Sequence, residues 1–230
     1  MRTGVEPVRR VLVALVTVVL AAVLAACSGG GQPVPTASPG GAAPDTAPVG
    51  TVVMVIRHGE KPDGSHPGID AQGDEDDSSL TAVGWQRAER LAELFDPPSG
   101  APRAGLARPV AIYAAGANDD GEGARTRETV APLAARLGIT VNTDYGKGDE
   151  EDLVDAVIAG PGPTLISWQH GELPAIADAF PGVTPTPPKD WPDDRFDVVW
   201  TFTRTADGWH FAQVPELVLP QDRSDVIDER

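Results

Sequence analysis

Thr51-Val-Val-Met-Val-Ile-Arg-His-Gly59 is the stretch of sequence that decides the fold. Residues 52–56 are all apolar and mostly β-branched, and no polar side chain alternates with them. Such a run is typical of a strand that is buried on both faces of a parallel sheet. Arg57 and His58 follow at the carboxyl end of this strand, which is the end where open α/β sheets bind their ligands.

Strands and helices alternate along the rest of the chain. Apolar spacing predicts helices over 81–95, 124–137, 151–159 and 173–180, and strands over 110–115, 139–142, 164–167, 196–203 and 209–214. This order predicts an α/β fold, a three-layer α/β/α sandwich with a mostly parallel sheet. The last two strands are joined by the turn Ala206-Asp207-Gly208, and we expect them to form an antiparallel edge.

Two further expectations concern side chains around this sheet. In the first helix, the spacing places Arg87, Glu89 and Arg90 on the exposed face. The polar loop 61–79 and the proline-rich loop 183–194, which contains Trp191, are long enough to wall a pocket.

The N-terminal residues 1–26 have the pattern of a bacterial secretory signal, with arginines before an uncharged apolar run over 11–26. The run is shorter than the about 20 residues that a membrane-spanning helix needs. It ends in Leu24-Ala-Ala-Cys27, which resembles the processing site of bacterial lipoproteins and implies a lipid on Cys27, the only cysteine. The pair Arg9-Arg10 leaves both general secretion and twin-arginine export open.

These features predict a domain order for an exported protein that is lipid-anchored to the outer face of the bacterial cell membrane. Residues 27–50 are rich in Gly, Pro, Ala and Ser, which predicts a flexible linker. We expect one folded domain over 51–220, long enough for a real core, and a polar tail over 221–230.

The charge of the chain restricts its partners. The formal net charge is −16, and the 230 residues include only three lysines. Nucleic-acid binding needs many Lys and Arg side chains against phosphates, so we expect no nucleic-acid partner. A phosphate site in this chain must be a local basic pocket within an acidic body.

Four segments carry a resemblance to a known family, and they come in the order in which that family has them. The segments are Val55-Ile-Arg-His-Gly-Glu60; Leu80-Thr-Ala-Val-Gly84 with Gln86 and Ala88; Arg125-Thr-Arg-Glu-Thr129; and Ile166-Ser-Trp-Gln-His-Gly171. Together they resemble the histidine phosphatase superfamily, whose fold is called phosphoglycerate mutase-like. The resemblance implies phosphoryl transfer through a phosphorylated histidine, without a cofactor or a metal.

The resemblance also implies roles for individual residues. His58 is the expected nucleophile, because a neutral imidazole can attack phosphorus near neutral pH. Arg57 and Arg125 are the expected phosphate-binding arginines, and His170 adds a further donor. Arg127 is the rival of Arg125, but the spacing to Thr129 favours Arg125.

The general acid that protonates the leaving oxygen is not fixed by these motifs. Glu150, in the acidic run 149–152, is the first candidate, although that run is equally well explained as a solvated helix start. Glu60 is the second candidate and Glu172 is the third.

Other polar groups have simpler explanations. His66 and His210 are expected at the surface, and the acidic run 73–77 lacks the spacing of a calcium loop. A zinc site at His58 and His170 would place a cation beside two arginines, which is unfavourable.

Two functions fit this sequence. The first is a lipid-anchored extracytoplasmic phosphatase that hydrolyses phosphate monoesters, with a small phosphorylated molecule or a phosphopeptide as substrate. The alternative is a lipoprotein on the same fold that binds a phosphorylated ligand without catalysis.

Overall fold

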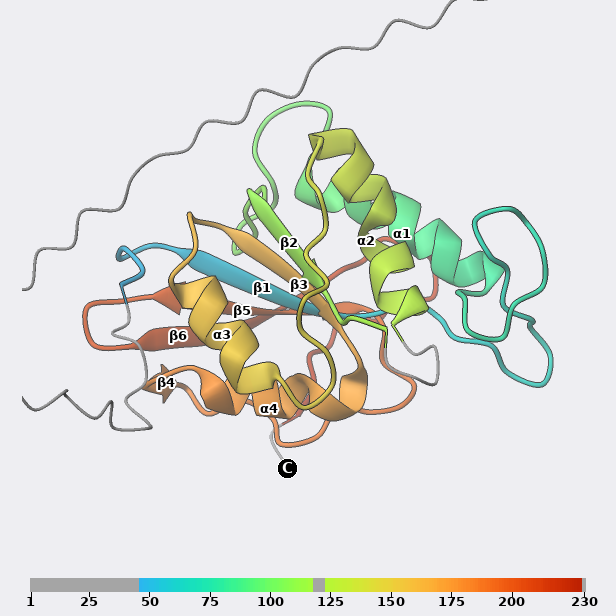
Figure 1. Cartoon of the computed structure of the whole chain (residues 1–230). Coiled ribbons are helices and arrows are strands. Elements are labelled where there is room, and N and C mark those ends of the chain that lie inside the picture. The colour runs from blue at the N-terminus through green and yellow to red at the C-terminus, as the bar shows by residue number, and fades with distance from the viewer. Residues whose placement is uncertain (1–45, 118–122, 229–230) are drawn as a thin grey trace, which may run out of the picture. The chain divides into compact units, whose positions relative to one another are not determined.

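The computed structural model describes residues 46–117 and 123–228, which form one mixed sheet between two layers of helices (Figure 1). The helices α1 and α2 cover one face of the sheet, and α3 and α4 cover the other (Figure 1). The predicted three-layer α/β/α sandwich is therefore confirmed. In chain order the elements are β1 Val52–Arg57, α1 Ala82–Phe95, β2 Ala111–Ala114, α2 Ala124–Leu137, α3 Glu150–Ile158, β3 Thr164–Trp168, the 3₁₀ turn η1 His170–Glu172, α4 Leu173–Ala179, β4 Val183–Thr184, β5 Val198–Arg204 and β6 Trp209–Pro215.

The strand β1 lies inside the sheet, whose order is β2-β3-β1-β5-β6-β4. It pairs in parallel with β3, in a register that runs from Val53 opposite Thr164 to Arg57 opposite Trp168. The hairpin β5–β6 joins the other side of β1 in the antiparallel sense, as the turn predicted. Beyond it, β4 adds a short parallel pairing with β6 that the sequence did not predict.

The buried run of β1 feeds two separate hydrophobic cores. Val53 and Val55 pack on the face covered by α3 and α4, whereas Met54 and Ile56 pack on the face covered by α1 and α2. All four side chains are fully buried. This explains why the strand is apolar at every position, because side chains alternate between faces and both faces are covered.

Three segments differ from the sequence expectation. Residues 139–142 form no strand, and only Asn142 makes an isolated bridge, to Tyr113. The segment 221–228, expected as a polar tail, packs on the domain, with Ile227 buried in the core. Ala47, within the expected linker, is also buried. The two terminal segments pack on the domain because each buries one apolar side chain, Ala47 or Ile227, in the core.

Arg87 was expected on the exposed face of α1, and this expectation is wrong, since Arg87 is only 2 % exposed. Its guanidinium pairs with three carboxylates, those of Glu60 at 2.8 Å, Glu216 at 2.7 Å and Asp222 at 2.7 Å. Burial raises the pKa of Glu216 to about 8, and the attraction of Arg87 offsets only part of this rise. The network attaches the C-terminal segment to α1 and to the loop after β1.

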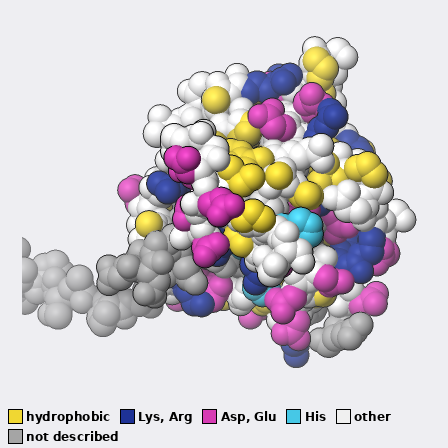
Figure 2. Space-filling view, turned by 90° about the vertical axis from the view of Figure 1, so that its right-hand side faces the viewer, with side chains coloured by type: hydrophobic (Ala, Val, Ile, Leu, Met, Phe, Trp, Pro, Cys, Tyr) yellow, Lys and Arg dark blue, Asp and Glu magenta, His cyan; other side chains and the backbone are white. Residues whose placement is uncertain are grey.

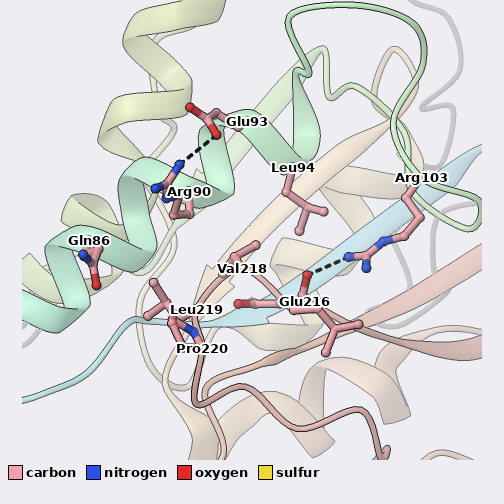
Figure 3. A pocket seen from close by; sticks show the side chains of 10 residues that line it. Gln86, Arg90, Glu93, Leu94, Arg103, Glu216, Val218, Leu219 and Pro220 are labelled. Carbon is pink, nitrogen blue, oxygen red and sulfur yellow. Dashed lines mark hydrogen bonds and ion pairs between the residues drawn. The ribbon is translucent and has the colours of Figure 1, made fainter.

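A cavity lies beside this network, between α1 and the segment after β6, and Glu216 is among the residues that line it (Figure 3). There Arg90 contacts Glu93 at 3.3 Å, and Arg103 donates to the Glu216 carbonyl at 2.7 Å. The Arg90–Glu93 pair is more than half exposed, so it gives a matched contrast to buried Arg87 on the same helix.

We expect Arg87→Met to lower the free energy of unfolding by about 3–5 kcal/mol, because it leaves buried carboxylates without their cation. Arg90→Met, one turn along the helix, should cost less than about 1 kcal/mol, since it removes only an exposed pair. Urea unfolding at neutral pH, followed by tryptophan fluorescence, measures both. Equal losses for the two variants would mean that the buried network does not stabilise the fold.

Candidate active site

The predicted nucleophile, His58, lies directly beyond the end of β1. Its backbone N–H donates to the Trp168 carbonyl of β3 at 3.0 Å, which continues the parallel pairing by one residue. Its ring Nδ1 lies 2.7 Å from the carbonyl oxygen of Gly59. Because a carbonyl oxygen can only accept, Nδ1 carries the hydrogen and the lone pair is left on Nε2.

The imidazole of His58 is held in its neutral form. The side chain is 4 % exposed, and burial lowers its pKa to about 3. The Gly59 hydrogen bond acts in the opposite direction, while the positive charges of Arg57 and Arg125 lower the pKa further. His58 therefore presents an unprotonated Nε2 throughout the neutral and mildly acidic range, which is the form that can attack phosphorus.

The Arg57 guanidinium is fully buried and fixed on one side. Its Nη1 donates to the backbone carbonyls of Pro192, Asp193 and Arg195, at 3.2, 2.8 and 3.0 Å. The Phe196 ring lies against its flat face, with the Arg57 Cζ 3.8 Å from the ring centroid. In contrast, Nε and Nη2 are buried without a hydrogen-bond partner.

Unpaired buried donors are unfavourable unless a ligand completes them. Burial lowers the pKa of Arg57 to about 10, with Asp193 and Glu60 acting against that shift, so the side chain stays charged at neutral pH. The two free nitrogens point to an anion as the missing partner.

The second predicted arginine, Arg125, belongs to the first turn of α2. Its Nη1 donates to the carbonyls of Asp77 and Ser78, both at 3.2 Å, and its Nε is buried without a partner. Thr129, one turn further on, accepts from the Gly59 N–H at 2.8 Å and donates to the Arg125 carbonyl at 2.7 Å. One hydroxyl thus links the nucleophile loop to the helix that carries Arg125.

Glycine is required where α1 meets the nucleophile loop. A Cβ added at Gly84 would lie 2.7 Å from the Glu60 carbonyl oxygen, and one at Gly59 would lie 3.1 Å from the Gly84 carbonyl oxygen. At Gly84 the backbones approach too closely for a larger residue without a shift, and at Gly59 the approach is tight. The glycine of the Leu80–Gly84 motif therefore has a steric role that sets the position of His58.

His170 begins the turn η1 after β3, on the same edge of the sheet as His58. Its Nε2 lies 2.7 Å from the Asp193 carboxylate. Burial and the charge of Arg57 lower the pKa of His170, and Asp193 offsets part of this effect. The side chain can therefore act as a neutral hydrogen-bonding group until a bound dianion raises its proton affinity.

A cavity of about 190 Å³ brings three of the predicted site residues together, His58, Arg125 and His170. It is lined by His58, Lys61, Gly123, Arg125, Thr126, Lys147, Gln169, His170, Gly171 and Glu172. Arg57 does not line this cavity, although its charge acts on His58. The face of the molecule shown in Figure 2 has histidine side chains among patches of both basic and acidic side chains.

The three candidate acids are placed differently. Glu150 is buried away from the cavity lining, and its carboxylate accepts from the Trp168 indole N–H at 3.1 Å and from the Gly148 N–H. Glu60 makes a two-pronged ion pair with Arg87. The structure therefore brings neither to the cavity, although both were ranked above Glu172. Only Glu172 lines it, with its carboxylate 2.7 Å from the Lys147 ammonium.

The remaining predicted positions have plain outcomes. Arg127 is exposed and does not line the cavity, which favours Arg125. His66 and His210 are exposed, as expected. Trp191 is a core residue whose ring packs on Trp200, so it is not a pocket wall. Cys27 and the segment 1–26 lie outside the described residues.

Within 46–117 and 123–228, no group of three or more His, Cys, Asp or Glu side chains could hold a metal ion. In that same part of the chain, no helix has the length and apolar character needed to cross a bilayer.

Sequence reasoning missed several residues of the site. Lys61 and Lys147 line the cavity, and the rarity of lysine in so acidic a chain was the one available signal. Phe196, whose ring packs on the Arg57 guanidinium, lies in the loop between β4 and β5 and matches no motif. The three carbonyls that hold Arg57 are backbone groups, which no sequence pattern identifies.

Comparison with known proteins yields likenesses among solved structures only. No family model and no curated protein sequence matches the chain. A mycobacterial glucosyl-3-phosphoglycerate phosphatase is 15 % identical, with 72 % of this chain and 97 % of that chain covered and a TM-score of 0.44. A protein described as a putative phosphohistidine phosphatase SixA, from Nakamurella multipartitia, is 16 % identical over 72 % and 95 %, with a TM-score of 0.45. Another putative SixA, from Agrobacterium tumefaciens, is 17 % identical over 70 % and 94 %, with a TM-score of 0.44.

Proposed function

We propose that this chain hydrolyses phosphate monoesters through a phosphohistidine formed on His58. One observation carries the proposal: a single cavity is lined by the buried, unprotonated imidazole of His58 and by Arg125, whose Nε has no hydrogen-bond partner. A phosphoryl group needs a nucleophile and positive charge around its equatorial oxygens, and these residues provide both. The four motifs that resemble the histidine phosphatase superfamily agree with this reading.

The proposed reaction has two steps. In the first, Nε2 of His58 attacks phosphorus while the bond from phosphorus to the leaving oxygen breaks, and Arg57 and Arg125 hold the equatorial oxygens. The Gly59 carbonyl stabilises the positive charge that develops on the ring, through Nδ1–H. In the second step, water attacks the phosphohistidine, which releases inorganic phosphate and restores the neutral imidazole.

Glu172 is our proposed acid for the leaving oxygen. It is the one carboxylate that lines the His58 cavity within the described residues, whereas Glu150 and Glu60 are engaged elsewhere. In its protonated form it would give a proton to the leaving oxygen, and as a carboxylate it would take one from the attacking water.

We also propose that the domain works outside the cytoplasm, tethered by a lipid on Cys27. The support is the pattern of residues 1–27, with its arginines, apolar run and single cysteine, followed by a Gly- and Pro-rich segment.

We expect the full-length chain to hydrolyse 4-nitrophenyl phosphate without added metal, and His58→Gln to abolish this turnover. Because the pKa of His58 is lowered to about 3, its protonation should not limit the rate until the pH approaches that value. The measurement is kcat/KM from pH 4 to 8, with an alkaline quench to trap the acid-labile phosphohistidine.

Exposed residues supply the controls for this experiment. His66→Gln should retain full activity, and Arg127→Gln should be unaffected while Arg125→Gln loses about 10²-fold or more, as is usual when a donor to the transition state is removed. A folded protein that binds phosphate but never turns over would favour the non-catalytic binding function instead.

Removing the acid should matter most when the leaving group is poor. We expect Glu172→Gln to lower kcat for an alkyl phosphate by about 10²–10⁴-fold, and to have a much smaller effect on 4-nitrophenyl phosphate, whose phenolate leaves unaided. Glu150→Gln is the comparison variant. Equal losses on both substrates would assign Glu172 a binding role in place of proton transfer.

Lipid attachment predicts a change in mass and in partitioning. When the full gene is expressed in a bacterium, the wild-type chain should enter the detergent phase and lack residues 1–26, and Cys27→Ser should remain unprocessed and unlipidated. Mass spectrometry of the N-terminal peptide distinguishes these forms. An unmodified Cys27 in the membrane fraction would contradict the proposal.

A further inference from the structure

The site has more positive charge than a phosphoryl group needs. A bound phosphomonoester presents three non-bridging oxygens. The unpartnered nitrogens of Arg57 and Arg125, together with His170, provide enough donors for all three. The charges of Arg57, Arg125 and His170 all act on His58, beside which the phosphorus must sit for in-line attack. Any further cation in the cavity therefore serves another part of the ligand.

Two such cations are present, Lys61 and Lys147. They account for two of the three lysines in a chain whose formal net charge is −16, so their meeting in one small cavity is unusual for this surface. Lys61 comes from the loop after β1 and Lys147 comes from the loop before α3, and both are exposed. Lys147 contacts Glu172 at 2.7 Å, which places its ammonium beside the proposed acid.

The charge balance of the lining indicates how much anionic charge fits. Lys61, Arg125 and Lys147 are positive and Glu172 is negative, and buried Arg57, whose charge acts on His58, adds one more positive charge. These five groups sum to three positive charges, so a bound phosphate dianion neutralises two of them and leaves about one. Asp193 also lies nearby, but it is 84 % exposed and faces His170, so water screens it strongly.

The size of the cavity limits the rest of the ligand. Its volume of about 190 Å³ lies below the roughly 300–1,000 Å³ that is typical of sites for drug-sized ligands. A phosphoryl group and a short extension fill such a space. The surplus charge and the small volume together describe a compact ligand with anionic groups at both ends.

We propose that the substrate carries a second anionic group, a carboxylate or another phosphate, on its leaving-group side, where Lys61 and Lys147 bind it. This inference rests on the proposed function, because it assigns the phosphoryl end of the ligand to His58. Lys61 and Lys147 are then specificity-determining residues. In the bound state the anionic group shares the Lys147 ammonium with Glu172.

Binding of two phosphonates tests the proposal without relying on turnover. 3-Phosphonopropionate carries a carboxylate opposite its phosphonate and butylphosphonate carries a methyl group there, and neither can be hydrolysed at the C–P bond. We expect the full-length chain to bind the carboxylate compound about five-fold more tightly in calorimetry, as one favourable ion pair provides. High salt should reduce this preference, because it screens exposed charges.

Variants separate charge from shape. Lys61→Met should remove most of the preference, Lys61→Arg should retain it, and Lys189→Met, which changes the one lysine outside the cavity, should leave both affinities as they are. A preference that survives in both Lys61→Met and Lys147→Met, or no preference in the wild type, would overturn the inference.

The result is distinguishable from a failure of the proposed function. If the preference is present but no phosphate ester is hydrolysed, the ligand class stands and the enzyme assignment falls. If esters are hydrolysed without any preference, the enzyme assignment stands and the ligand class falls. If neither phosphonate binds, the cavity is not a phosphoryl site and both fall.

Discussion

The parallel pairing of β1 with β3 is the constraint on which the site depends. It places Arg57 opposite Trp168, so both strands end at the same edge and His58 and His170 emerge side by side. The backbone hydrogen bond from His58 to Trp168 extends the ladder one residue beyond the strand, which orients the imidazole before any side-chain contact acts. A slip of one residue would turn these side chains to opposite faces of the sheet.

The electrostatics of the site follow from burial rather than from the overall charge. A buried arginine is stable only where hydrogen-bond acceptors or opposite charges surround it, whatever the net charge of the chain. Three backbone carbonyls hold one nitrogen of Arg57 and a phenyl ring covers its face, while the remaining nitrogens stay unpaired beside His58. The same burial that lowers the pKa of His58 to about 3 keeps the nucleophile unprotonated. One desolvated environment therefore prepares both the nucleophile and the anion site.

Local patterns predicted the elements well, because they depend on neighbours in the sequence. The bounds of α2 and the strand that ends at Arg57 follow directly from apolar spacing and the glycine at residue 138. Long-range polar contacts could not be predicted in this way. Arg87 has the helical spacing of a surface residue, yet it is buried against Glu216 and Asp222, which are 129 and 135 residues away in the sequence. The position of Glu150 could not be predicted for a related reason, since the Trp168 indole that donates to its carboxylate lies 18 residues away in the sequence.

The loop after β1 connects the stability of the domain to its chemistry. Three successive residues of this loop have three different roles. The Gly59 carbonyl accepts a hydrogen bond from the His58 ring, Glu60 pairs with buried Arg87, and Lys61 lines the cavity. The close approach of Gly84 fixes this loop from the other side. The C-terminal segment, through Asp222 on Arg87, therefore acts on the position of the nucleophile although it lies outside the cavity. A carboxylate at residue 60 then serves best as a structural anchor, because its partner Arg87 is buried, whereas the Lys147 partner of Glu172 is more than half exposed and can be replaced by water.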